Sequence, residues 1–276
     1  MTLSRIELED IGSPADLAKR IHELDPHLPL AFEIEDLCRR LDISEIHDKS
    51  INSFAAALIM HPDKAWGEIL VAKDTPPQRR RFSIGHELGH FLIPSHRPHH
   101  GHRFSYSTLD LLANDSGAGD QARRMEAEAN RFAAELLMPA KRIRSNLQRR
   151  QPDLAEIVRL ANEFEVSKAA MARSYVDAHG ETLALLVVRD GKIAQAHRPN
   201  DFPWIAPKIS EAVPQGSVFH EQPLRPGELS EMEECDPEVW LGTSAARKVD
   251  ILSEQILAQR DDWAMVLLHA ELNEAG

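Results

Sequence analysis

The sequence predicts an α+β protein built from three segments. Residues 1–140 combine helical patterns with two short strand-like runs, residues 141–179 read as a pair of helices, and residues 180–276 alternate strands and turns. A length of 276 residues and a hydrophobic content of 42% fit a globular chain with two or three subdomains. We therefore expect three parts: an N-terminal domain large enough to hold an active site, a small helix-turn-helix-like module and a C-terminal α+β domain.

The first segment begins with helical patterns and continues with strands. Residues 1–50 read as helical, with one helix starting near Ser13 and a second after Pro29. Residues 54–60 and 68–72 alternate more like strands than helices, and the His-Pro-Asp sequence between them is a turn signal. A Pro-Pro pair then separates the strands from the next helix.

The later segments are assigned from the same signals. Residues 157–164 and 169–176 have apolar positions at helical spacing, and only Lys168 and Arg173 give the second helix positive charge. We therefore interpret the pair as a packing module. An Asp-Gly dipeptide at positions 190 and 191 predicts a hairpin. The runs that read as strands are 182–188, 192–198, 216–220 and 263–271.

The sequence His86-Glu87-Leu88-Gly89-His90 carries the strongest chemical signal. Residues four apart share one face of a helix, so both imidazoles can bind one metal ion. Glu87 is then placed to act as a general base toward a metal-activated water. The alternative is a buried helix with two hydrogen-bonded histidines. The apolar residues around the motif indicate a buried helix, in which two imidazoles need partners.

A catalytic zinc site needs a third protein ligand, and the sequence offers Glu126 or His96. Glu126 lies on the small, apolar stripe of a predicted helix, where a carboxylate requires a cation. Glu128 falls on the opposite, charged side and is expected to face solvent. Asn130, one turn after Glu126, can hydrogen-bond a ligand or join two helices. His96 has metzincin-like spacing, but Ile93 stands where that pattern has glycine, so Glu126 is favoured.

Two blocks of sequence together resemble a known family. The blocks Arg81-Phe-Ser-Ile-Gly-His-Glu-Leu-Gly-His90 and Glu126-Ala-Glu-Ala-Asn-Arg-Phe-Ala-Ala-Glu-Leu-Leu-Met-Pro139 resemble the ImmA/IrrE metallopeptidases. The resemblance implies a zincin-like fold, with His86, His90 and Glu126 as zinc ligands and Glu87 as general base. It also implies a substrate class, helix-turn-helix repressors of stress responses or mobile elements.

The chain also departs from that family. Gly85 stands where the family usually has alanine, a change that we expect to be harmless. Residues 94–120 are polar, histidine-rich and irregular, and we interpret them as an insertion or a lid. His99, His100, His102 and Tyr106 from this stretch are candidate oxyanion donors. Some members carry a GAF-like regulatory domain, which is the analogy available for residues 180–276.

The leading functional hypothesis is a zinc-dependent endopeptidase acting on a protein, with Mn²⁺ or Fe²⁺ as alternative metals. Residues 67–72 are the candidate edge strand for binding an extended substrate, or else an ordinary sheet strand. A second hypothesis is a non-catalytic transcriptional regulator or partner-binding protein that keeps the peptidase fold. A third is a zinc hydrolase of small substrates.

Composition limits the location and the partners. A net charge of −12 argues against general nucleic-acid binding, although the basic runs 79–81 and 141–150 keep DNA as an alternative partner. No apolar run approaches the roughly 18 residues of a membrane span. The acidic N-terminus does not resemble a signal peptide, so we expect a cytoplasmic protein. Cys38 and Cys235 then fit reduced thiols.

Overall fold

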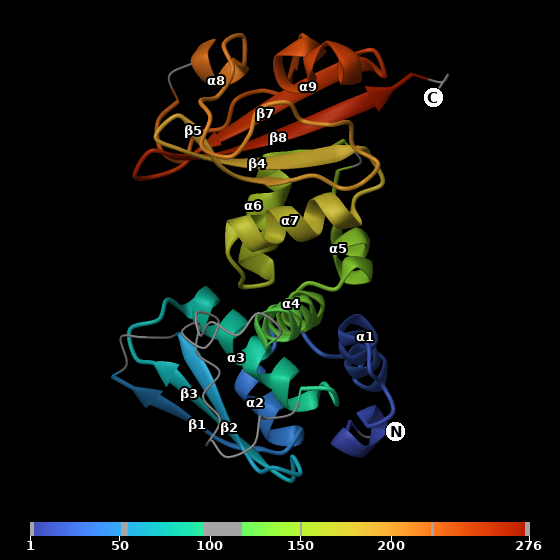
Figure 1. The fold of residues 1–276 in the computed structure, drawn as a ribbon, viewed down its shortest axis with the longest axis vertical. Helices are drawn as coiled ribbons and strands as arrows, with labels where there is room; N and C mark the ends of the chain where they lie inside the picture. Colours follow the sequence, from blue (N-terminus) through green and yellow to red (C-terminus); the bar gives the residue numbers. More distant parts are fainter. Residues whose placement is uncertain (1–2, 51–54, 97–117, 150, 222–223, 274–276) are drawn as a thin grey trace. The chain divides into compact units, whose positions relative to one another are not determined.

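The computed structural model describes residues 3–50, 55–96, 118–149, 151–221 and 224–273 (Figure 1). The chain forms two compact units, which are described separately. Unit 1 comprises residues 1–139 and 163–167, and unit 2 comprises residues 140–162 and 168–276. Each unit combines helices with one sheet, so the predicted α+β class is confirmed. Among the described residues, no helix is long and apolar enough to cross a membrane.

Unit 1 opens with three helical elements and ends with two long helices. Ser13 caps the second element as the sequence indicates, because its side chain accepts a hydrogen bond from the Asp16 amide at 3.4 Å. The elements in chain order are η1 (Arg5–Leu8), α1 (Pro14–Leu24), α2 (Ile34–Arg40), β1 (Ile43–Lys49), β2 (Ala56–Met60), β3 (Gly67–Ala72), α3 (Pro77–Leu92) and α4 (Ala118–Leu137).

The sheet of unit 1 corrects two expectations. Its strand order is β1-β3-β2, with β1 parallel and β2 antiparallel to β3. The prediction that residues 67–72 form the edge strand is wrong, because β3 is hydrogen-bonded on both sides. The reading of residues 1–50 as wholly helical is also wrong, since residues 43–49 form β1. This strand is mostly polar and exposed, and so it lacks the apolar alternation that reveals a strand.

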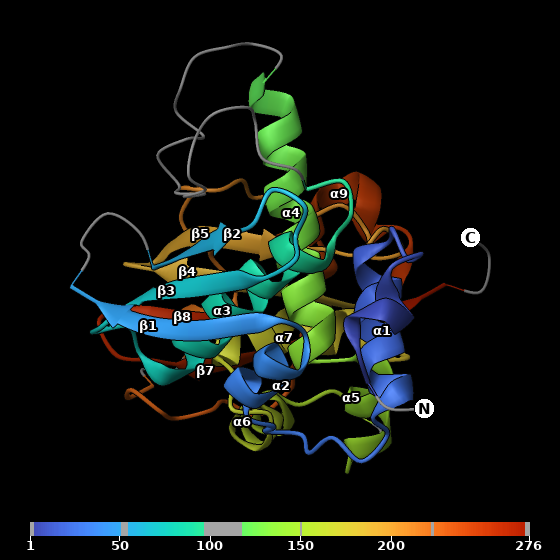
Figure 2. The ribbon, with the colours of Figure 1, turned by 90° about the horizontal axis from the view of Figure 1, so that it is seen from below.

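Helices α3 and α4 pack closely, and α1 contacts α4 from its other side (Figure 2). Gly89 of α3 permits the close approach: a Cβ atom added there would lie 2.9 Å from the Cδ1 atom of Phe132 on α4. A Cβ atom at Gly85 would meet the Ala133 Cβ at 3.5 Å, an ordinary van der Waals distance. The expectation that alanine fits at position 85 is therefore consistent with the packing.

Unit 2 is built on a five-stranded antiparallel sheet of order β5-β4-β8-β7-β6. The predicted Asp-Gly hairpin is confirmed, with φ of 50° at Asp190 and 68° at Gly191. The elements are α5 (Ala140–Asn146), α6 (Leu154–Glu163), α7 (Lys168–Ala178), β4 (Leu183–Arg189), β5 (Lys192–His197), α8 (Val218–Glu221), β6 (Glu233–Cys235), α9 (Pro237–Ala246), β7 (Val249–Ala258) and β8 (Trp263–Leu272).

Two features of unit 2 differ from the sequence interpretation. The strand expected at residues 216–220 is wrong, because residues 218–221 form the short helix α8. The Ser217 hydroxyl accepts a hydrogen bond from the Phe219 amide at 3.1 Å, which favours a turn there over an extended chain. The sequence interpretation does not include strand β7, although nine of its ten residues pair with β8.

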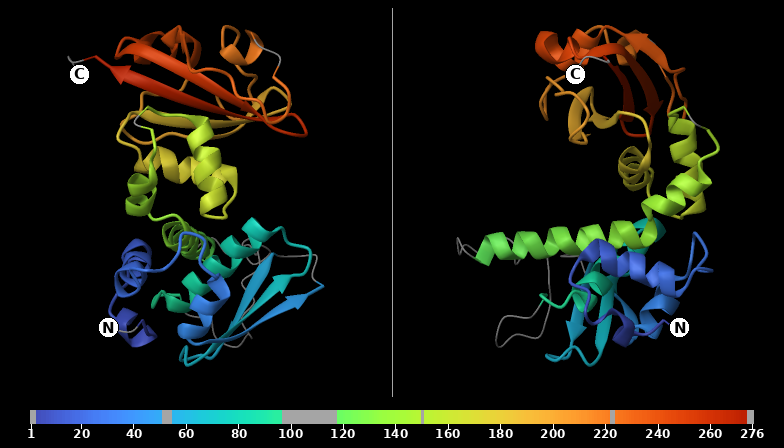
Figure 3. Two further views of the ribbon diagram at one scale, coloured as in Figure 1. Left: turned by 180° about the vertical axis from the view of Figure 1, so that it is seen from behind. Right: turned by 90° about the vertical axis from the view of Figure 1, so that its right-hand side faces the viewer.

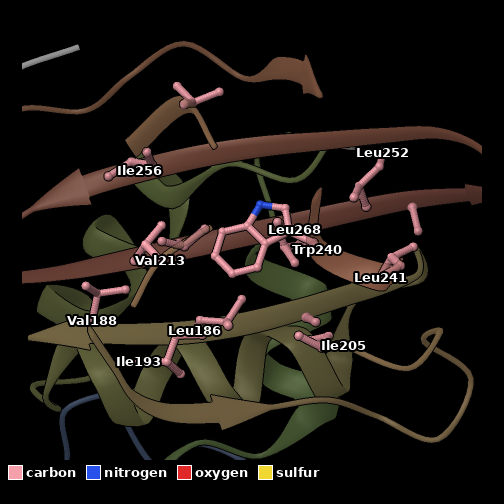
Figure 4. Close-up of a cluster of buried hydrophobic side chains, with 14 of the residues drawn as sticks. Leu186, Val188, Ile193, Ile205, Val213, Trp240, Leu241, Leu252, Ile256 and Leu268 are labelled. Carbon is pink, nitrogen blue, oxygen red and sulfur yellow. The ribbon is translucent and has the colours of Figure 1, made fainter. Parts of the chain in front are cut away.

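The sheet of unit 2 is covered on both faces (Figure 3). Helices α8 and α9 cover one face, and α6 and α7 lie on the other. On the α9 side the Trp240 ring packs against Leu186 and Leu268 (Figure 4). The start of α6 is tied to β7, because the Gln255 side-chain oxygen accepts from the Leu154 amide at 2.7 Å. Helices α5–α7 therefore group with this sheet.

Candidate metal centre

The motif helix α3 is mostly buried from Arg81 onward, as the apolar residues around the motif indicate, whereas its first turn is exposed. His90 is fully buried and Glu87 is 3% exposed. Helix α4 lies alongside and contributes Glu126 from the stripe that faces α3. The two helices thus bring the sequence candidates for a metal site into one place.

Three side chains converge on a single point. The Nε2 atoms of His86 and His90 are 3.1 Å apart, and each lies 3.2 Å from an oxygen of Glu126. A tetrahedral ion with ligands at about 2.0–2.1 Å separates its ligand atoms by about 3.3–3.4 Å. The burial and spacing of these three side chains therefore suit one small divalent cation. Among the described residues, they form the cluster of metal-ligating groups close enough to share an ion. His96 is not a member of it.

The electrostatics of the site match a cation-binding role. Burial raises the pKa of Glu126, but hydrogen bonds from His86 and His90 outweigh it and hold that pKa well below its usual range. Burial raises the pKa of Glu87 to about 8, an effect opposed by His86 and by the Leu58 amide. Within the described chain, the buried Oε2 atom of Glu87 has no hydrogen-bond partner. A buried oxygen of this kind is costly unless a ligand or water meets it.

Each histidine of the cluster has a partner behind it. The Nδ1 atom of His86 lies 3.0 Å from Oδ1 of Asn130. The sequence suggested this hydrogen bond between Asn130 and a metal-binding side chain. The Nδ1 atom of His90 lies 3.0 Å from Nδ1 of His96, and His96 Nε2 lies 2.9 Å from Oε2 of Glu128. The prediction that Glu128 faces solvent is therefore wrong: its side chain is only 33% exposed and is paired with His96.

A lysine holds the chain that carries His96. The Lys64 ammonium donates to the backbone carbonyls of His90 at 3.0 Å and Ile93 at 2.6 Å, at the C-terminal end of α3. The His96 amide then donates to the Ile93 carbonyl at 3.1 Å, which closes a turn. This turn brings His96 back beside His90. Burial lowers the pKa of His96 to about 4, against the opposing effect of Glu128.

Strand β2 borders the site. The Ala72 amide donates to the Ala55 carbonyl and the His61 amide to the Trp66 carbonyl, so the odd-numbered residues direct their backbone groups toward β3. The backbone groups of the even-numbered residues, including Leu58, then point away from β3. The Leu58 amide accordingly donates to the Glu87 carboxylate. In the described part of the chain, β2 pairs with β3 alone.

Some candidates from the sequence cannot be placed. His99, His100, His102 and Tyr106, the possible oxyanion donors, lie outside the described residues. The sequence interpretation missed Lys64, the role of β2 and the contact between His96 and Glu128. The sequence gives one signal for the last of these features, the position of His96 shortly after the motif, but that position suggests a metal ligand.

A comparison with protein families identifies this region. Residues 60–174 match the family model described as Peptidase_M78, the IrrE N-terminal-like domain. Residues 60–174 are therefore similar to an IrrE N-terminal-like domain and are called the IrrE-like domain below. The resemblance to the ImmA/IrrE family and the zincin-like fold are thereby confirmed, and the IrrE-like domain contains all three converging side chains.

The fold extends beyond the IrrE-like domain. A solved structure described as a Mycobacterium tuberculosis transcriptional regulator is similar to 99% of this chain and 96% of its own, with a TM-score of 0.56 and 16% identity. At that identity the likeness concerns the fold. No curated protein matches the sequence.

Proposed function

We propose that this chain is a zinc-dependent metallo-endopeptidase that cleaves a protein. The convergence of His86, His90 and Glu126 near a Glu87 oxygen that has no hydrogen-bond partner among the described residues carries the proposal. His86, His90 and Glu126 would hold the ion with three protein ligands, the number that catalytic zinc sites have. When bound, zinc supplies Lewis-acid chemistry that polarises a carbonyl and makes water more acidic. Mn²⁺ and Fe²⁺ suit the same ligand set.

Glu87 is the general base in this proposal. The Leu58 amide holds the carboxylate in place, and the free Oε2 atom accepts the proton of the attacking water. The same carboxyl group then returns that proton to the nitrogen of the leaving amine. A purely structural metal site needs no such base, so the presence of Glu87 favours catalysis over a metal that only supports the fold.

The position of β2 supports a peptide as the substrate. Its outward backbone groups are hydrogen-bond donors and acceptors in a row, next to Glu87, and an extended peptide can pair with them as an added strand. A hydrolase of small molecules has no need of such an edge. The family resemblance adds the substrate class, a helix-turn-helix repressor, and with it a role in stress or mobile-element regulation.

The test uses Glu87→Gln, which removes the base and retains the shape. The zinc-loaded protein is mixed with a helix-turn-helix repressor encoded beside it, and fragments are sought by mass spectrometry. Wild type should cleave the repressor, whereas the variant should bind zinc with unchanged stoichiometry and give no fragments. Equal cleavage by both proteins would refute the role of Glu87.

The alternative is a non-catalytic regulator, the kind of function named for the similar Mycobacterium tuberculosis protein. It predicts that Glu87→Gln preserves the effect on the partner. A zinc-loaded wild type that changes repressor activity without producing fragments, matched by the variant, would favour this alternative.

A further inference from the structure

We propose that His96 and Glu128 are positioning residues that hold the His90 ring with its Nε2 atom toward the metal. The inference rests on the proposed metal site and adds to it a buried hydrogen-bonded chain behind one ligand. The chain runs from Glu128 on α4 through His96 to His90 on α3. It concerns zinc affinity and ligand geometry, and so it can be judged separately from peptidase activity.

The direction of each hydrogen bond follows from Glu128. A carboxylate only accepts, so the Nε2 atom of His96 carries the proton that it shares with Oε2 of Glu128 at 2.9 Å. A neutral His96 then has its lone pair on Nδ1, which accepts the proton of His90 Nδ1 at 3.0 Å. His90 is left with its lone pair on Nε2, the atom that faces His86 and Glu126.

Because both rings are buried, loss of a hydrogen-bond partner is costly for either of them. The side chains of His90 and His96 are both 0% exposed, so water cannot replace either partner. Without His96 the Nδ1 proton of His90 would lose this acceptor in the interior, which favours the other tautomer or a rotated ring. His86 has a different support, the neutral amide of Asn130. The carboxylate-backed partner is therefore specific to His90.

The placement of His96 depends on features outside the metal ligands. The turn from Ile93 to His96 is closed by a backbone hydrogen bond, and Lys64 holds the carbonyl at the start of that turn. The alternative is that His96 only fills the core. In that case its acceptor atom would not matter, and any side chain of suitable size would serve.

Two substitutions at position 96 separate these alternatives. His96→Asn keeps an acceptor, because its Oδ1 atom is the same number of bonds from Cα as Nδ1 of histidine. His96→Ala removes the acceptor. Zinc affinity is measured by competition with a chromophoric chelator, and the cobalt-loaded protein is compared by its visible absorption spectrum.

We expect His96→Ala to weaken zinc binding by about 10–100-fold and to alter the cobalt spectrum, as loss of a partner behind a metal ligand typically does. His96→Asn should remain within about threefold of wild type by the same reasoning. His197→Ala is the matched control, since it removes another histidine–carboxylate pair, to Asp177 at 2.7 Å. Its zinc affinity should be unchanged.

Glu128→Met tests the chain without removing a buried ring, because methionine lacks an oxygen that can accept the His96 proton. It should weaken zinc binding in the wild-type background and have little effect in the His96→Asn background, because asparagine accepts without help from Glu128. This comparison also decides the matter if His96→Ala does not fold. Equal zinc affinity of wild type, His96→Ala and Glu128→Met would overturn the inference.

The outcomes distinguish this inference from the proposed function. A wild-type protein that takes up no zinc would refute the metal site on which both depend. A wild-type protein that binds zinc but cleaves nothing would refute only the peptidase activity. A zinc-binding protein indifferent to His96 and Glu128 would refute only the positioning role.

Discussion

Alanine at two glycines of α3, one helical turn apart, should change stability in different ways. Replacing glycine by alanine inside a helix stabilises it by about 1 kcal/mol, because less backbone entropy is lost on folding. At Gly85 the new Cβ atom would meet Ala133 at 3.5 Å and Leu137 at 3.9 Å, both ordinary contacts. Gly85→Ala should therefore stabilise the protein by about 1 kcal/mol.

Gly89→Ala makes the same chemical change in a tighter place. Its Cβ atom would lie 2.9 Å from Cδ1 and 3.3 Å from Cβ of Phe132, a fully buried ring. Forcing extra volume into a packed core costs about 1–3 kcal/mol. Since both variants gain the same helix propensity, this packing cost is the expected difference between them, and Gly89→Ala should be the less stable by about 1–3 kcal/mol.

Urea unfolding of EDTA-treated wild type and both variants measures these differences, because metal removal prevents ligand binding from shifting the midpoint. Gly89→Ala should also bind zinc more weakly, since a displaced α4 carries Glu126 away from the histidines. Equal stability of the two variants would refute the close packing of α3 on α4 at Gly89, and a destabilised Gly85→Ala would refute the looser packing at Gly85.

Three further predictions concern other parts of the chain. Burial raises the pKa of Glu254 despite hydrogen bonds from Ser217 and Trp240. Wild type should therefore lose stability relative to Glu254→Gln as the pH rises from about 4.3 through the folded-state pKa. Thermal melts at a series of pH values measure this difference, and a gain in the stability of wild type relative to the variant would contradict it. Burial raises the pKa of Cys235 to about 12 and that of Cys38 well above its usual range, so neither thiol should react with Ellman's reagent at pH 8 until the protein unfolds. Lys64→Met removes two hydrogen bonds to carbonyls at the end of α3 and should lower the free energy of unfolding by about 1–3 kcal/mol, whereas an unchanged urea midpoint would argue against the cap.

Local patterns accounted for much of the candidate site. His86 and His90 are four residues apart on a helix, and Glu126 lies on the apolar stripe of α4, so helical geometry alone places each group on a buried face. The hairpin at Asp190 and Gly191 is equally local, because two left-handed residues in succession define the turn. Such features depend on neighbours within a few positions of the chain.

Other features could not be read from periodicity. The contact of Glu128 with His96 joins residues 32 positions apart, and helical spacing within α4 alone assigned Glu128 to solvent. The place of β3 in the sheet depends on β1, whose polar exposed sequence does not resemble a strand. Helix α8 replaced an expected strand because Ser217 forms a local turn and also donates to the distant Glu254.

The sequence by itself indicated which residues can bind a metal, which can act as a base, and that the two segments carrying them become helices α3 and α4. These follow from side-chain type and from spacing along one helix. Only the tertiary structure decided which strand borders Glu87 and which groups stand behind each histidine. Strand order and contacts between distant segments depend on how several surfaces pack together at once, and no single stretch of sequence contains that information.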